Sequence, residues 1–232
     1  MTPQALMLRR RAPLRLVIFD CDGVLVDSEP VANRVIAEQL TALGWPMPTE
    51  EATRRFLGVS LADMQPIVAA RLGTALPAGW AAVIQARIVA ALAAEAVAIP
   101  GAIAALQALR GMGIAWRIAS NSSHEEMAAK FHRLGISALV AGRLHSFTDV
   151  PQGKPAPDLF LAAAAAEGAG AAECVVVEDS PLGVRGAVAA GMDCLGFVPH
   201  GDGVALDAVG AVPFHAMADL PGLLALARRR AA

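Results

Sequence analysis

Two aspartates, Asp20 and Asp22, follow directly on a short apolar run and are followed by a glycine. The run Leu16–Phe19 is typical of a strand buried on both faces, as in a parallel sheet. Carboxylates this close together repel one another, so a cation or a shared proton is needed to hold both at the strand end. Carboxylate oxygens without nitrogen or sulfur ligands favour magnesium. The pair indicates metal-assisted chemistry, and the alternative is a simple acidic turn, because Asp-Gly is common in turns.

Two more polar clusters follow apolar, strand-like runs further along the chain. Residues 120–123 read Ser-Asn-Ser-Ser, and residues 178–180 read Glu-Asp-Ser. Because the carboxyl ends of parallel strands open into one crevice, we expect residues 20, 120 and 178 to be neighbours. Hydroxyls at a helix start predict an anion site, although Ser122 and Ser123 could equally be helix N-caps. Glu178 and Asp179 have a similar alternative as acids in the first turn of a helix.

A single lysine between a glycine and a proline, Lys154, supplies the missing positive charge. Only Lys130 and Lys154 are lysines among the 19 basic residues, so a lysine in this rigid loop is a poor candidate for a random solvated cation. Its ammonium group is a compact point charge that suits both carboxylate and phosphate. Competing motifs fail: no Walker A loop and no nucleophile elbow is present, and the five histidines show no metal-ligand spacing.

The composition argues against several classes of protein. The net charge of −2 lacks the basic excess of a nucleic-acid-binding protein, and no uncharged apolar run is long enough to span a membrane. Cys21, Cys174 and Cys194 are scattered, which favours buried free thiols in a reducing compartment. We therefore expect a cytoplasmic protein with no nucleic-acid or membrane partner. The arginine clusters 9–11 and 228–230 are interpreted as solvated tails.

The apolar periodicity predicts an α/β fold with a helical insertion. One strand precedes the segment 30–97, that segment is helical throughout, and strands alternate with helices after it. We therefore expect an arm at 1–13, a Rossmann-like parallel-sheet core at 14–29 plus 98–232, and an all-helical cap at 30–97. Strands are predicted at 14–20, 114–119, 139–143, 174–177, 194–198 and 212–215. Helices are predicted at 31–43, 49–56, 61–72, 80–96, 99–110, 124–134, 157–167 and 182–190.

The four polar clusters, in this order, resemble the haloacid dehalogenase-like hydrolase superfamily from about residue 14 onwards. Asp20-Cys21-Asp22-Gly23 resembles its first motif, and Ser120, Lys154 and Glu178-Asp179 resemble the other three. The helical insertion resembles the cap of the subgroup that contains β-phosphoglucomutase and phosphoglycolate phosphatase. The first motif, with residues 26–29, is most similar to bacterial sugar-phosphate phosphatases, including the 6-phosphogluconate type.

The resemblance implies a role for each cluster. Asp20 is the expected nucleophile that forms an aspartyl-phosphate, and Asp22 is the expected general acid and base. The resemblance also implies that magnesium is the cofactor, and that the phosphoryl oxygens are bound by a separate set of residues. The implied metal ligands are Asp20, the carbonyl of Asp22, and Asp179, with Glu178 in an outer position; the implied phosphate-binding groups are Ser120, the amide of Asn121, and Lys154.

Within the superfamily, the residues favour a phosphatase. Asp22 argues against a dehalogenase, and the lack of lysine in 30–97 argues against a phosphonatase with an imine-forming cap lysine. The main alternative is a β-phosphoglucomutase-type mutase, but Ala32 and Leu61 stand where such mutases usually carry a histidine and an arginine. A remote alternative is a phospho-accepting receiver domain, which would be about half this length and lack a cap.

Substrate choice is expected to depend on the cap. Arg54 and Arg55 could reach an acidic group of the substrate, or they could form a solvated helix face, and Gly58 lies in the stretch 56–60 that resembles the substrate loop of related caps. The predicted function is magnesium-dependent hydrolysis of a small phosphomonoester, most simply a sugar phosphate, by a monomer.

Overall fold

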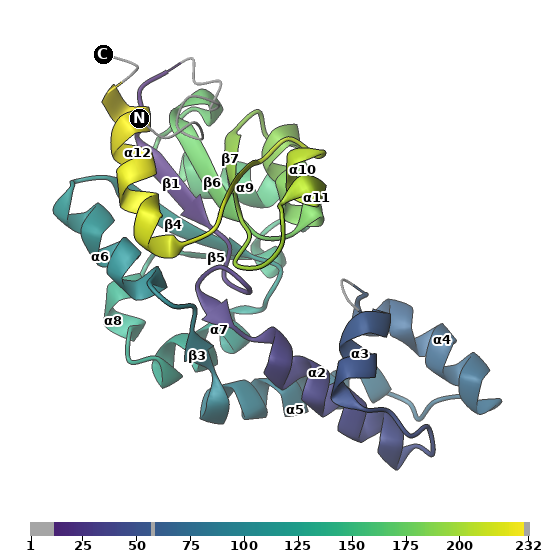
Figure 1. Ribbon diagram of the computed structural model, residues 1–232. Coiled ribbons are helices and arrows are strands. Elements are labelled where there is room, and N and C mark those ends of the chain that lie inside the picture. The colour runs from purple at the N-terminus through teal and green to yellow at the C-terminus, as the bar shows by residue number, and fades with distance from the viewer. Residues whose placement is uncertain (1–11, 57–58, 230–232) are drawn as a thin grey trace.

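The structure, a computed structural model, describes residues 12–56 and 59–229. Its centre is a parallel six-stranded sheet with the strand order β5-β4-β1-β6-β7-β8 (Figure 1). This arrangement confirms the predicted α/β fold with a Rossmann-like sheet. The strands are β1 (Leu16–Phe19), β4 (Ala115–Ser120), β5 (Leu144–Ser146), β6 (Cys174–Glu178), β7 (Asp193–Phe197) and β8 (Val212–Phe214).

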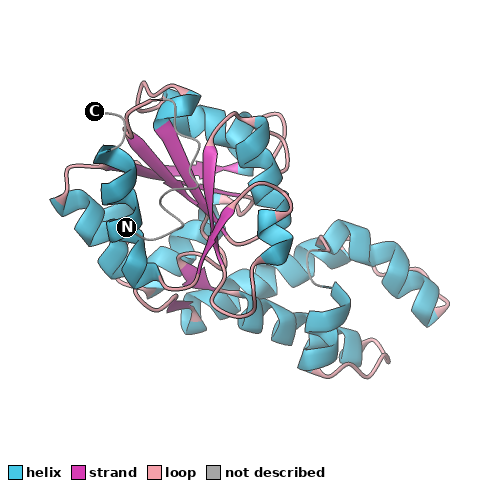
Figure 2. Ribbon diagram, turned by 45° about the horizontal axis from the view of Figure 1, so that its top comes forward, coloured by secondary structure: helices cyan, strands magenta, loops and turns pink. Residues whose placement is uncertain are grey.

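Helices cover both faces of the sheet (Figure 2). Along β1, Leu16 and Ile18 belong to one apolar cluster, with α9 (Asp158–Ala165) and α10 (Pro181–Ala189). Val17 and Phe19 belong to another, with α6 (Ala102–Gly111) and α12 (Leu220–Arg229). All four side chains are fully buried, as expected for a central parallel strand covered on both faces. The core helices are α6 (Ala102–Gly111), α7 (His124–Arg133), α8 (Ser137–Val140), α9 (Asp158–Ala165), α10 (Pro181–Ala189), α11 (Val204–Asp207) and α12 (Leu220–Arg229), with short 3-10 turns at Phe147–Asp149, Ala171–Glu173 and Met217–Asp219.

A helical segment projects from the carboxyl end of β1 (Figure 1). It consists of α2 (Glu29–Ala42), α3 (Thr49–Phe56), α4 (Leu61–Leu72) and α5 (Trp80–Glu95). Its two connections to the core pair as a short antiparallel ladder of β2 (Val26–Asp27) and β3 (Val97–Ala98). The described elements between residues 29 and 95 are thus helical, as the sequence predicted; the division into an arm, a core and a cap stays a prediction.

Three local expectations differ from the structure. The strand expected at 139–143 is wrong, because α8 ends at Val140 and the edge strand β5 begins at Leu144. The ladder of β2 and β3 was not expected, since two-residue strands have no periodicity. The expected tail at 228–230 is also wrong where it is described: α12 ends at Arg229, and Arg228 donates a hydrogen bond to the carbonyl of Met112 at 2.9 Å. The arginines at 9–11 and Arg230 lie outside the described residues.

The apolar face of α12 explains why the C-terminal segment folds onto the core. Leu220, Leu223, Leu224 and Ala227 are buried at helical spacing, and they belong to the same cluster as Val17 and Phe19. The three cysteines are buried thiols that do not pair as disulfides, as predicted. Among the described residues, no helix has both the length and the apolar character to cross a membrane.

Candidate active site

The register of the central strands brings the first and fourth motifs together. Phe19 of β1 pairs with Val177 of β6, and the amide of Asp20 donates to the carbonyl of Val177 at 2.9 Å. The residues that follow, Asp20 and Glu178, therefore leave adjacent strands at the same edge of the sheet. Their side chains are buried, although both are acidic. Two buried carboxylates side by side require a compensating cation.

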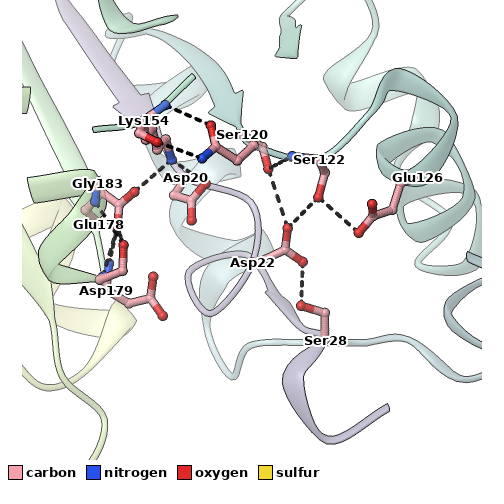
Figure 3. Close-up of polar contacts among 12 residues, drawn as sticks. Asp20, Asp22, Ser28, Ser120, Ser122, Glu126, Lys154, Glu178, Asp179 and Gly183 are labelled. Carbon is pink, nitrogen blue, oxygen red and sulfur yellow. Dashed lines mark hydrogen bonds and ion pairs between the residues drawn. The ribbon is translucent and has the colours of Figure 1, made fainter. Parts of the chain in front are cut away.

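Lys154 is that cation, as the sequence predicted for a positive charge in this loop. Its ammonium Nζ lies 2.6 Å from Oδ1 of Asp20 and 2.7 Å from Oε1 of Glu178 (Figure 3). The loop itself is held by Asn121, whose side chain accepts from the amide of Lys154 at 2.9 Å and donates to its carbonyl at 3.1 Å. Asn121 therefore positions Lys154 through its side chain, a role that the sequence did not indicate.

Glu178 is fixed on both of its oxygens. Oε1 accepts from Lys154, and Oε2 accepts from the amides of Asp179 and Ser180 and from the Ser180 hydroxyl, each at 2.9 Å. The N-cap of α10 is Ser180, whose hydroxyl accepts from the amide of Gly183. The alternative that Glu178 is only a helix-capping acid therefore does not hold, because this carboxylate joins β6, the Lys154 loop and the start of α10.

Asp179 is the third carboxylate of the cluster. Oxygen atoms of Asp20, Glu178 and Asp179 lie within 4.8 Å of one another. The carboxylate of Asp179 accepts no hydrogen bond from any residue in 12–56 or 59–229, in contrast to that of Glu178. Burial raises the pKa of Asp179, and the nearby Asp20 and Glu178 charges raise it further. Burial also raises the pKa of Asp20, against the opposing effect of Lys154.

This donor set fits a hard divalent cation. All of its donors are oxygens, and one carboxylate of the set lacks a protein partner, which is the composition that magnesium sites use. Three carboxylates face one ammonium group, so the fully ionised cluster needs further positive charge. Because Glu178 already has donors on both oxygens, Asp20 and Asp179 are the carboxylates open to direct ligation.

Two glycines leave room for these carboxylates. A Cβ atom on Gly23 would lie 1.9 Å from Oδ2 of Asp179, and one on Gly183 would lie 1.7 Å from Oε1 of Glu178. Gly23 also has φ +73°, a left-handed conformation that side chains disfavour. The close approach of backbone to carboxylate explains why the loop after β1 and the first turn of α10 each carry glycine at these positions.

Ser120 ends β4, the strand on the other side of β1. Its hydroxyl is buried, accepts from the amide of Ser122 at 3.0 Å, and lies 3.4 Å from Oδ2 of Asp22. Ser123 is the N-cap of α7 and accepts from the amide of Glu126, so the capping interpretation is correct for Ser123. For Ser122 it is wrong, because its hydroxyl lies 2.8 Å from Oδ2 of Asp22 instead.

Asp22 points away from the other carboxylates, toward Ser122 and Ser28 (Figure 3). Its Oδ1 lies 2.6 Å from Nζ of Lys130 and accepts a hydrogen bond from the Ser28 hydroxyl. Burial alone would raise the pKa of Asp22, but Lys130 and the hydroxyls of Ser28 and Ser122 outweigh it and lower that pKa below its usual value. Asp22 therefore contributes its side chain to a second cluster, next to the one that contains Asp20.

Lys130, Glu126 and Ser28 are parts of this site that were not predicted from the sequence. Lys130 is fully buried on α7 and pairs with both Asp22 and Glu126 at 2.6 Å. One signal was available, because Lys130 is one of only two lysines in the chain. Its distance of 108 residues from Asp22 gave no local pattern by which the pair could be recognised.

The two arginines that the sequence analysis suggested could reach the substrate belong to α3 of the helical segment. Arg54 and Arg55 are exposed at the end of α3; Arg55 lies 3.8 Å from Glu51 and stacks over the Trp45 ring at 4.9 Å. Their predicted contact with substrate stays a prediction. Gly58, the third cap residue singled out from the sequence, lies outside the described residues.

Comparison with known proteins places the chain in a family. The family model of haloacid dehalogenase-like hydrolases matches residues 14–191. The 6-phosphogluconate phosphatase of Escherichia coli strain K12 is 32% identical over 190 residues, which cover 81% of this chain and 85% of that protein.

Solved structures share the whole architecture. A haloacid dehalogenase family hydrolase from Deinococcus radiodurans R1, with bound phosphate and sodium, is 32% identical with a TM-score of 0.77, covering 91% of this chain and 98% of that one. A putative β-phosphoglucomutase from Thermotoga maritima is 26% identical with a TM-score of 0.77, covering 91% and 99%. The likeness thus includes the sheet and the helical segment together.

The close approach of Gly183 to the Glu178 carboxylate predicts the effect of one methyl group added at position 183. Gly183→Ala should displace the Glu178 carboxylate from Lys154, and the cluster should then bind magnesium weakly. At 100 times its dissociation constant an ion adds about 2.7 kcal/mol of stability, a rise of about 5–10 °C in melting temperature for a chain of this size. We expect this rise in the wild type and its loss in Gly183→Ala. Gly222→Ala is the matched control, because a Cβ on Gly222 meets nothing within 4 Å. An equal rise in melting temperature with magnesium in both variants would contradict this account of the contact between Gly183 and Glu178.

Proposed function

This chain belongs to the haloacid dehalogenase-like hydrolase family and is a phosphatase of that family, and from this premise we propose that it hydrolyses a small sugar phosphate through an aspartyl-phosphate on Asp20. The observation that supports the proposal most is the buried Asp20 carboxylate, with Lys154 at 2.6 Å and Asp179 beside it, and a second aspartate two residues on. A buried carboxylate next to a fixed cation is suited to attack an anionic phosphoryl group, because the cation offsets the repulsion between the two.

The proposed chemistry uses two displacements at phosphorus. A carboxylate oxygen of Asp20 forms a bond to phosphorus while the ester P–O bond breaks. Asp22, which is ionised in the free site, takes up a proton when the anionic phosphate binds beside it, and it gives this proton to the departing alkoxide. Asp22 then takes a proton from water, whose oxygen attacks the same phosphorus. That step releases inorganic phosphate, restores the Asp20 carboxylate and leaves Asp22 protonated for the next cycle.

Magnesium is the proposed cofactor. Asp20, Asp179 and the backbone carbonyl of Asp22 would hold it, with Glu178 supporting from an outer position through Lys154 and the amides of α10. When bound, the ion supplies positive charge that offsets the phosphoryl oxygens. The buried, mutually repelling carboxylates of Asp20 and Asp179 are consistent with such a ligand.

The phosphoryl oxygens are proposed to bind Ser120, the amide of Asn121 and Lys154. Ser120 and Lys154 come from different elements, the end of β4 and the loop before α9. Asn121 joins the two, since its side chain holds the backbone of Lys154. We further propose that residues 30–97 act as a cap over this site, which would exclude water and add contacts to the sugar.

The substrate class is proposed from the relatives and from the cap. The Escherichia coli relative is named for 6-phosphogluconate, a phosphorylated sugar acid, and the Deinococcus radiodurans structure holds phosphate. The mutase alternative has the Thermotoga maritima structure in its favour. A mutase must grip a second phosphate in its cap, however, and Ala32 and Leu61 offer no charge for that. We therefore propose hydrolysis as the reaction.

The first test of this proposal is the nucleophile. Asp20→Asn should lower turnover by on the order of 10³-fold or more, because an amide is a poor nucleophile and a weak metal ligand. Phosphate release from p-nitrophenyl phosphate measures the loss. Asp207→Asn makes the same chemical change at an exposed position of α11 and should keep wild-type turnover. Retention of more than about a tenth of wild-type turnover in Asp20→Asn would exclude the covalent mechanism.

The second test is the reaction itself. With magnesium, the wild type should release inorganic phosphate from at least one member of a panel of hexose, pentose and sugar-acid phosphates, without any bisphosphate activator. Chelation should abolish this release, and added magnesium should restore it, because the donor set consists of oxygens. Conversion of glucose 1-phosphate to glucose 6-phosphate, with bisphosphate dependence and negligible phosphate release, would instead establish the mutase alternative.

A further inference from the structure

Asp22 is held by a buried ion cluster on α7. Lys130 has no exposed surface, and its Nζ lies 2.6 Å from Asp22 and 2.6 Å from Oε1 of Glu126. The Ser122 hydroxyl lies between them, 2.9 Å from Nζ, 2.8 Å from Asp22 and 3.0 Å from Glu126. Every charged group of this cluster thus has a partner of opposite sign, and Lys130 and Ser122 contact both oxygens of the Asp22 carboxylate.

Stability alone does not account for this cluster. A buried ion pair often stabilises a fold no better than apolar side chains of similar volume. α7 already packs an apolar face into the core through Met127 and Phe131, so a third apolar residue at position 130 would extend that face. The cluster instead fixes one orientation of the Asp22 carboxylate, close to the Ser120 hydroxyl and pointing away from the carboxylate of Asp20 (Figure 3).

The cluster also reaches the helical segment. The other oxygen of Glu126, Oε2, accepts a hydrogen bond from Gln85 of α5 at 2.8 Å. α5 lies along α7 (Figure 1), and Arg133 of α7 donates to the carbonyl of Ala94 at the end of α5 at 2.7 Å. Gln85, Glu126, Lys130 and Asp22 therefore form one continuous chain of polar contacts that begins on the insertion and ends at the proposed general base.

We propose that Lys130 and Glu126 are positioning residues for Asp22. Gln85 links them to α5, so that the packing of α5 against α7 determines the orientation of the Asp22 carboxylate. This inference rests on the proposed function, because it assigns Asp22 the proton transfers. Lys130 fixes the carboxylate of Asp22, Glu126 fixes the ammonium of Lys130, and Gln85 fixes the carboxylate of Glu126. None of the three touches the reacting phosphoryl group.

A substrate with a good leaving group separates positioning from folding. p-Nitrophenolate departs without a proton from Asp22, so its release in the first turnover of p-nitrophenyl phosphate does not require a correctly oriented acid. Hydrolysis of the aspartyl-phosphate does need Asp22 as base. Rapid mixing therefore reports the two steps separately, as a first burst of nitrophenolate and a later steady rate.

In Lys130→Met we expect the steady rate to fall by on the order of 10-fold to 100-fold, within the contribution of an acid–base group. The burst should persist at a rate near that of the wild type and approach one nitrophenolate per active site. Because Lys130→Met leaves Asp22 and Glu126 buried without their cation, Gln85→Ala serves as the second variant. It should show the same pattern with a smaller fall, about threefold to tenfold, and it decides the question if Lys130→Met does not fold.

Arg87→Ala is the control on the same helix, because Arg87 is exposed two residues from Gln85. It should match the wild type in both phases. A wild-type steady rate in Gln85→Ala, or an equal fall of burst and steady rate in Lys130→Met and Gln85→Ala, would overturn the positioning role. Asp22→Asn is the benchmark for the proposed function: a wild-type steady rate in that variant would refute the role of Asp22 itself, whatever the other variants do.

Discussion

The ion contacts of Lys154 with Asp20 and Glu178 are the interaction on which the rest of the site depends. Three carboxylates converge at the ends of β1 and β6, and within 12–56 and 59–229 only the Lys154 ammonium makes ion pairs with any of them. Burial makes their mutual repulsion strong, so the fully ionised arrangement requires further positive charge. This excess of negative charge would destabilise a purely structural cluster, but it suits the binding of a metal ion. The positive charge of a bound ion would in turn attract an anionic phosphoryl group.

The fold holds this arrangement in place with few parts. The parallel register of β1 and β6 sets Asp20 beside Glu178, and the side chain of Asn121, after β4, fixes the loop that carries Lys154. Gly23 and Gly183 leave the space that two of the carboxylates occupy. Lys130 holds the side chain of Asp22 apart from the three carboxylates, although the two aspartates are only two residues apart. The site is thus divided into two clusters, to which the proposed mechanism assigns the phosphoryl group and the proton transfers respectively.

The fold class and these motifs could be predicted from the sequence because strand ends in a parallel sheet converge whatever the details of packing. That rule was sufficient for Asp20, Ser120 and Glu178, and the rigid Gly-Lys-Pro loop, in a chain with only two lysines, indicated Lys154. The partner of Asp22 was not predictable, since it depends on which face of α7 turns toward the loop after β1. The edge strand β5 and the helix α12 were misread because a short strand and a helix that begins with Leu-Pro-Gly give weak local signals.

The central claim is that Asp20 accepts the phosphoryl group, and the most direct measurement is the site of phosphorylation in the Asp22→Asn variant. In this variant the intermediate should accumulate, because its hydrolysis requires the base. After mixing with p-nitrophenyl phosphate and magnesium, acid quenching and peptide mass spectrometry should locate one phosphoryl group on Asp20. A phosphoryl group on another residue, or nitrophenolate release in the first turnover with no phosphorylated peptide, would contradict the account.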